Sequence, residues 1–136
     1  MKLHRDSSLL HYRISAWQAN QITLQPPQQP RCHEQPELIV QRQSFIISSN
    51  SLEPWPYRKL DELTPEVLED LCQRFSFEIF LLGSGAQHRY PETALFTPLI
   101  SRQCGFEVMS TAAACRTFNV LVDEARPLLA AMLLET

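Results

Sequence analysis

Two stretches decide the fold of this chain: FEIFLLGSG at residues 77–85 and FEVMSTAAACRTFNVLVD at residues 106–123. The first is apolar from Phe77 to Leu82 apart from Glu78, and Phe106–Met109 resembles it, as is typical of strands covered on both faces. The second stretch continues as a helix from Ser110 and Thr111 to about Asp123. Another helical segment, starting near Pro91 or at Thr97, lies between them. This strand, helix, strand, helix order predicts two parallel strands joined by a helical crossover.

The first half of the chain reads as short strands followed by one helix. Proline and glutamine interrupt the strands with an irregular loop at 25–36, because proline removes a backbone donor and restricts its predecessor. Thr64, followed by Pro65 and Glu66, predicts the start of a helix that runs to about Arg74. Trp55 is expected to anchor the core or its edge. The strands are expected at 12–17, 21–24, 37–41 and 45–48.

The C-terminal segment 127–134 is ambiguous. Leucine, alanine and methionine favour a helix, while the run is short enough for an edge strand. The residues by themselves favour the helix.

Length and composition predict one α/β domain over residues 1–136, with residues 1–36 the least certain part. The net charge of −3 and the scattered basic residues exclude a nucleic-acid surface. The longest apolar run, 128–134, is too short to cross a membrane, and the first ten residues lack a secretory pattern. We therefore expect a cytoplasmic protein without membrane insertion.

The four cysteines, Cys32, Cys72, Cys104 and Cys115, are expected to be free thiols because no export signal accompanies them. Their spacing and that of the histidines complete no zinc pattern. We expect no metal and no cofactor.

A candidate ligand or partner site follows from the parallel strands, whose carboxyl ends meet at one sheet edge, where open α/β sheets bind ligands. Glycines there let a backbone approach an anion, helix N–H groups point at negative charge, and arginine adds bidentate bonds. The alternative is structural, with the glycines supplying only turns and Thr111 only a helix cap. The G-x-G pattern completes neither phosphate-binding fingerprint. The candidate residues are Gly83, Ser84, Gly85, Arg89, Ser110, Thr111, Cys115, Arg116 and Asn119.

No complete catalytic set accompanies this site. Ser84 lacks the flanking glycines of a nucleophile elbow. Cys115, near a helix start, would be a reactive thiolate if the helix dipole lowered its pKa, with His88 as a base; the alternative is a small buried apolar residue. The chain is therefore not expected to be an enzyme.

The predicted 111–123 helix carries an apolar stripe for the core and a polar stripe of Arg116, Asn119 and Asp123. The polar stripe is interpreted as a solvated face, with a partner-binding surface as the alternative. Arg116 is predicted to reach the Gly83 loop, so that Arg116→Ala would cost about 1.5 to 3 kcal/mol.

The segments FLLGSGAQHRY and PLISRQCGFEVMSTAAACRTFNVLVDE resemble the signature region of a small domain family of unknown function. This family includes the mitochondrial respiratory complex I (NADH dehydrogenase) assembly factor and the adipogenesis-associated protein of animals. Many relatives have Asp where this chain has Ser110 and Gly where it has Ala112, so a role of that carboxylate is not expected here. The matching positions are Leu82, Gly83, Gly85, Thr111, Ala114, Cys115, Arg116, Thr117, Phe118 and Asn119.

The resemblance implies a three-layer α/β domain with a central mixed sheet, in which the last segment returns as an antiparallel strand. It also implies a non-catalytic protein-interaction or assembly module with a protein partner, linked to assembly of a membrane respiratory complex. The alternative is a binding protein or enzyme for a small anionic metabolite at the Gly83, Thr111 and Arg116 crevice. Homo-oligomerisation is left open.

Overall fold

The computed structural model describes residues 10–18, 20–28 and 37–135, and its centre is a mixed five-stranded sheet. In spatial order its strands are β5 (Leu52–Pro54), β4 (Phe45–Ser48), β8 (Leu128–Met132), β6 (Ile79–Gly83) and β7 (Gly105–Met109). β8 pairs antiparallel with β4 and parallel with β6. β6 also pairs parallel with β7, which confirms the predicted relation between these two strands.

A second, antiparallel sheet of three strands forms from the start of the described chain. Its inward side chains, Ile14, Ile22 and Leu24, are buried, so the alternation predicted from the sequence sets its register. An irregularity between Ile14 and Ala16 interrupts the first pairing. The strands are β1 (Arg13–Gln18), β2 (Gln21–Gln25) and β3 (Ile39–Gln41).

The two long helices begin where the sequence predicted, but the N-cap of the second is Ser110, and Thr111, suggested as a cap, is its first helical residue. In α2 (Pro65–Arg74) the Thr64 hydroxyl accepts a hydrogen bond from the Val67 amide, and in α4 (Thr111–Asp123) the Ser110 hydroxyl accepts one from Ala113. The predicted segment after Pro91 comprises a 3₁₀ turn, η2 (Thr93–Phe96), and the short α3 (Thr97–Ser101). β5 and a further 3₁₀ turn, η1 (Leu60–Glu62), were not predicted.

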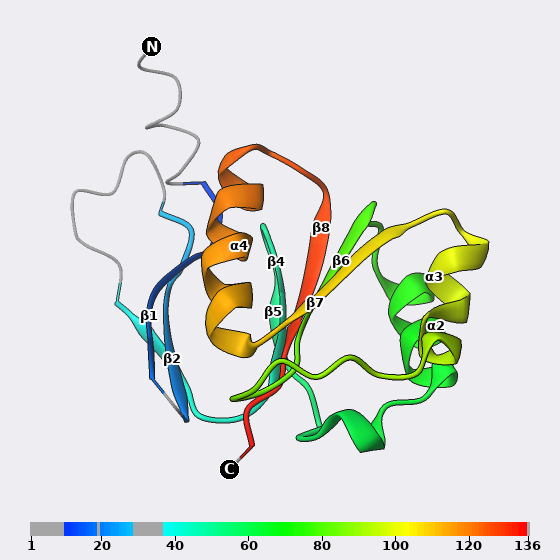
Figure 1. Cartoon of the computed structure of the whole chain (residues 1–136). Helices are drawn as coiled ribbons and strands as arrows, with labels where there is room; N and C mark the ends of the chain where they lie inside the picture. Colours follow the sequence, from blue (N-terminus) through cyan, green and yellow to red (C-terminus); the bar gives the residue numbers. More distant parts are fainter. Residues whose placement is uncertain (1–9, 19, 29–36, 136) are drawn as a thin grey trace.

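The elements form three layers, and the central sheet is the middle one (Figure 1). One apolar cluster joins the sheet to α4 and the three-stranded sheet, and includes Ile14, Phe45 and Phe118. The other joins the opposite face to α2 and α3, and includes Leu68, Phe80 and Phe96. The predicted fold class, a three-layer single α/β domain with a mixed sheet, is therefore confirmed.

The C-terminal segment is a strand, as the family resemblance implied, and its antiparallel pairing with β4 confirms that expectation. The helix that its own residues favour does not form, and β8 is not an edge strand, because it lies between β4 and β6 and all five of its residues are buried. Pairing on both sides outweighs the helical preference of leucine and alanine. β7, predicted as a buried strand, is an edge strand in which Val108 is the one buried residue.

Candidate functional site

The predicted meeting of the Gly83 turn and the start of α4 is confirmed, and we call it the glycine junction (residues 83–85 with 110 and 111). The Gly85 amide donates a 2.9 Å hydrogen bond to the Thr111 hydroxyl, and the Thr111 amide donates one of 2.9 Å to the Gly85 carbonyl. The Thr111 hydroxyl also donates to the Leu133 carbonyl at 2.8 Å. One side chain therefore ties β6, α4 and the C-terminal segment together.

Both glycines are required by the geometry. Gly85 has a φ of +104°, a conformation that side-chain-bearing residues rarely adopt. At Gly83 a Cβ atom would lie 3.0 Å from the Thr111 Cα and 3.2 Å from the Met132 sulfur. The close approach of α4 to β6 therefore depends on the absence of a side chain at Gly83.

The two serines of the junction form hydrogen bonds with neighbouring residues of the chain. The Ser84 amide donates to the Met109 carbonyl at 2.7 Å, and the Ser84 hydroxyl donates to the Gln87 carbonyl at 2.8 Å. The same hydroxyl accepts the Arg89 amide at 3.2 Å. The Ser110 hydroxyl accepts the Ala113 amide at 3.3 Å. The amides of Ser84, Gly85, Thr111 and Ala113, which could otherwise bind an anion, thus donate hydrogen bonds within the chain.

A hollow of about 380 Å³ lies beside the junction. Its walls come from the β1–β2 hairpin, the start of α4 and residues 133–135. Glu135 is the one charged residue among the described residues that line it, so its charge does not favour an anion. The lining residues are Trp17, Gln18, Asn20, Ile22, Gly85, Ala86, Thr111, Ala112, Leu133, Leu134 and Glu135.

Arg116 does not bond the Gly83 loop, contrary to the prediction. Its guanidinium lies over the Trp17 ring, 5.5 Å from the ring centroid, while the side chain stays exposed. An exposed contact of this kind contributes about 0.5 to 1 kcal/mol. Arg116→Ala is therefore expected to lower the free energy of unfolding by about 0.5 to 1 kcal/mol, and not by the roughly 1.5 to 3 kcal/mol predicted for a bond to the Gly83 loop.

The polar stripe of α4 is not a solvated face, because it docks β1. The Asn119 amide group donates to the Ile14 carbonyl at 2.8 Å and accepts the Ile14 amide at 2.9 Å. Asp123 forms an ion pair with Arg13. Sequence reasoning placed these residues on one side of the helix but had no signal for the strand that covers them.

Cys115 is not a reactive thiolate. It is fully buried, and burial raises the pKa of its thiol to about 12. The interpretation of Cys115 as a small buried residue is therefore confirmed: the thiol lies in the core, and desolvation, which disfavours the charged form, outweighs the effect of the helix dipole. Cys72, Cys104 and Cys115 are all free, as predicted, whereas Cys32 lies outside the described residues.

We expect Cys115 to resist alkylation in the native protein. With iodoacetamide at pH 8.5, mass mapping of the modified peptides should show Cys104 and Cys72 reacting first, since both are partly exposed. In denaturant all three should react alike. The Cys115 thiol's contribution to stability is intact below about pH 8.5 and lost as the pH rises towards the folded-state pKa. Native alkylation of Cys115 ahead of Cys104 would contradict this assignment.

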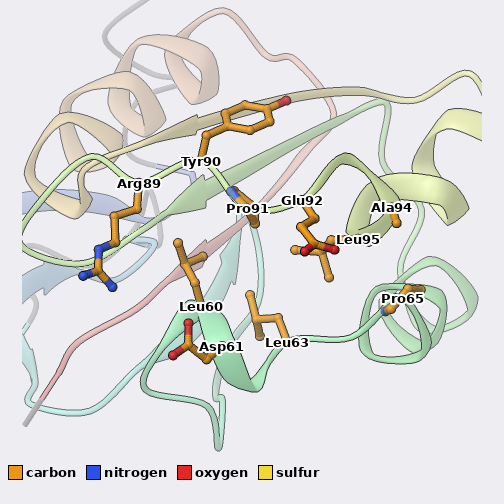
Figure 2. Close-up of a pocket in the computed structure, with 10 residues that line it drawn as sticks. All are labelled: Leu60, Asp61, Leu63, Pro65, Arg89, Tyr90, Pro91, Glu92, Ala94 and Leu95. Atoms are coloured by element: carbon orange, nitrogen blue, oxygen red, sulfur yellow. The ribbon is translucent and has the colours of Figure 1, made fainter.

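Arg89 lies apart from Arg116, in a groove of about 650 Å³ that sequence reasoning missed. One wall is the turn at 60–63, and the other is the segment 89–92 (Figure 2). No motif marks these residues, and only the fold brings them together. We call this hollow the 60/90 groove, lined by Leu60, Asp61, Leu63, Pro65, Arg89, Tyr90, Pro91, Glu92, Ala94 and Leu95.

The 60/90 groove combines apolar surface with uncompensated charge. Leu63 and Leu95 are buried, and Tyr90 is 58% exposed. The side chains of Asp61, Arg89 and Glu92 are exposed, and none forms a hydrogen bond or ion pair with another described residue. Such a surface can hold an apolar side chain while pairing with charges on either side of it.

Within the part of the chain that the structure describes, no cluster of three or more His, Cys, Asp or Glu side chains could hold a metal ion. None of the described helices is long and apolar enough to cross a membrane.

The fold and the site define a small three-layer α/β domain whose glycine junction joins two strands to a helix. Residues 37–133 match the family described as protein of unknown function (DUF498/DUF598), and the chain belongs to this family. A search of the curated proteins gave no match.

Solved bacterial structures share the fold. A Bordetella parapertussis protein is 21% identical, with a TM-score of 0.76 over 92% of this chain and 97% of that one. A Xanthomonas campestris protein is 29% identical, with a TM-score of 0.71 over 90% and 84%. A protein described as an outer membrane protein of Bartonella henselae is 23% identical, with a TM-score of 0.65 over 93% and 97%.

Proposed function

We propose that this protein is a non-catalytic interaction module that holds a segment of a partner protein in the 60/90 groove. The observation that supports it most directly is the groove itself, with Leu63 and Leu95 at its base and three charged side chains without partners among the described residues. A partner segment could bury an apolar side chain there and satisfy these charges. The exposed Tyr90 ring is the kind of side chain that contributes strongly at protein interfaces.

The alternative, a small anionic metabolite bound at the glycine junction, has less support. The junction amides are hydrogen-bonded within the chain, the adjacent hollow carries Glu135, and Arg116 is engaged with Trp17. A catalytic use of this site lacks a nucleophile, because Cys115 is buried and Ser84 already holds the 84–89 turn.

The family resemblance makes the proposal more specific. The partner would be a subunit of a membrane respiratory complex that the module holds during assembly, and the module would act in the cytoplasm. A protein that holds a segment of a partner needs a groove that is partly apolar, and the 60/90 groove, of about 650 Å³, has leucine and proline side chains in its lining.

Site-specific crosslinking tests the proposal. Tyr90, 58% exposed, is replaced by the photocrosslinker p-benzoylphenylalanine, and Val120, 56% exposed on α4, is replaced in the matched control. After irradiation in native extract, we expect one polypeptide to be linked at position 90 and not at position 120. Arg89→Glu should weaken its capture, while Arg126→Glu, at an exposed arginine that does not line the groove, should not.

The two readings give different outcomes. Equal crosslinking at both positions would contradict a groove-directed partner. In a thermal-shift screen of anionic metabolites, a ligand at 100 times its dissociation constant would add about 2.7 kcal/mol. Such a stabilisation, lost in Arg116→Ala and kept in Arg89→Glu, would favour the metabolite alternative.

A further inference from the structure

The outer edge of β7 is open for pairing. The Gly105 amide donates to the Glu78 carbonyl at 3.0 Å, and the Met109 carbonyl accepts the Ser84 amide at 2.7 Å, so both residues face β6. Backbone groups alternate in direction along a strand, so Glu107 also faces β6, and Phe106 and Val108 present their N–H and C=O groups outward. No other described strand pairs with β7 on that side.

The side chains at this edge have opposite characters on the two faces of the sheet. Phe106 and Val108 belong to the cluster beneath α2 and α3, where the Phe106 ring stacks on Phe96 with centroids 4.2 Å apart. Glu107 is exposed on the α4 side and forms no hydrogen bond or ion pair with another described residue. A strand added here would meet apolar, acidic and apolar side chains in turn.

This pattern disfavours a second copy of the chain as the added strand. In an antiparallel pair that uses both outward residues, Phe106 of each copy faces Val108 of the other, which places the two Glu107 side chains directly opposite each other. Like charges at directly opposed positions are destabilising. A charged residue in an edge strand also commonly blocks self-association.

We propose that the β7 edge binds an extended segment of a different protein, with a basic side chain opposite Glu107 and apolar side chains on either side of it. The backbone of the segment pairs with Phe106 and Val108, its Lys or Arg pairs with Glu107, and its apolar residues extend the layer beside Phe106. Main-chain bonds supply affinity and the alternating side chains supply specificity. The β7 edge shares no residue with the 60/90 groove, so an experiment can contradict binding at one surface and leave binding at the other untouched.

A palindromic peptide tests this edge whichever direction the strand takes. Acetyl-Thr-Val-Lys-Val-Thr-amide is titrated into the ¹⁵N-labelled full chain, with acetyl-Thr-Val-Glu-Val-Thr-amide as the matched control. We expect the amides of Phe106 and Val108 to shift and to exchange more slowly with the lysine peptide. Binding of the lysine peptide should be about two- to tenfold tighter than that of the control. Glu107→Lys should reverse this preference, and Glu92→Lys in the groove should leave it unchanged.

Each contrary result would overturn a different part of this proposal. Shifts that spare Phe106 and Val108 would overturn the edge site, and equal binding of both peptides would overturn recognition by charge. If, without peptide, the amides of Phe106 and Val108 exchange more slowly as the protein concentration increases, the edge binds a second copy of the chain.

Discussion

Gly83→Ala is expected to lower the free energy of unfolding by about 3 kcal/mol, because the added methyl group would clash with neighbouring atoms. Its Cβ would lie 3.0 Å from both the Cα and the hydroxyl oxygen of Thr111, and 3.2 Å from the Met132 sulfur. The methionine can turn aside, but the Thr111 Cα is backbone at the start of α4. Relief therefore requires α4 to move away from β6, which would open the core around Phe118.

Gly105→Ala is the matched control, since Gly105 begins the neighbouring strand. A Cβ there would meet only the Glu78 carbonyl, at an ordinary distance of 3.7 Å. Its stability should be unchanged or raised by up to about 1 kcal/mol, because alanine loses less backbone entropy than glycine on folding. Urea unfolding with unchanged m-values measures both variants. Equal effects of the two substitutions would contradict the close approach at Gly83.

The sequence was sufficient to predict the elements that local chemistry determines. Thr64, Pro65 and Glu66 gave the start of α2, and Ser110 and Thr111 gave that of α4. In these cases a hydroxyl bonds the amide three residues further along the chain and sets the helix boundary, so residues close in sequence suffice. The glycine junction was also predicted, because parallel strands bring their carboxyl ends to one edge.

Contacts between distant segments could not be predicted in this way. β8 is a strand because β4 and β6 pair with it on both sides, although its own residues favour a helix. Arg116 reaches Trp17, and Asn119 bonds Ile14, because the three-stranded sheet folds back over α4. The 60/90 groove likewise lies between two segments that are distant in sequence and carry no common sequence motif. Family resemblance supplied the strand at β8, whereas nothing in the chain signalled the groove.

Thr111→Val is expected to cost about 2 to 4 kcal/mol, although the two side chains have nearly the same shape. The Thr111 hydroxyl accepts the Gly85 amide at 2.9 Å and donates to the Leu133 carbonyl at 2.8 Å, in a side chain that is 6% exposed. Valine fills the same space but leaves a buried donor and a buried acceptor without a partner, and each costs about 1 to 3 kcal/mol.

Thr117→Val, six residues further along α4, is the matched control for this substitution. Its hydroxyl contacts the Met109 sulfur at 3.2 Å, and sulfur is a weak acceptor, so the loss should be within about 0.5 kcal/mol. Both changes replace threonine by valine in the same helix, so they share the loss of a hydroxyl and differ in the hydrogen bonds that the hydroxyl makes. Amide exchange provides a second measurement, in which the Gly85 N–H should exchange faster in Thr111→Val only. If Thr111→Val unfolds at the same urea concentration as Thr117→Val, the hydroxyl is not what holds the C-terminal segment to α4, and the junction depends on apolar packing around Gly83 alone.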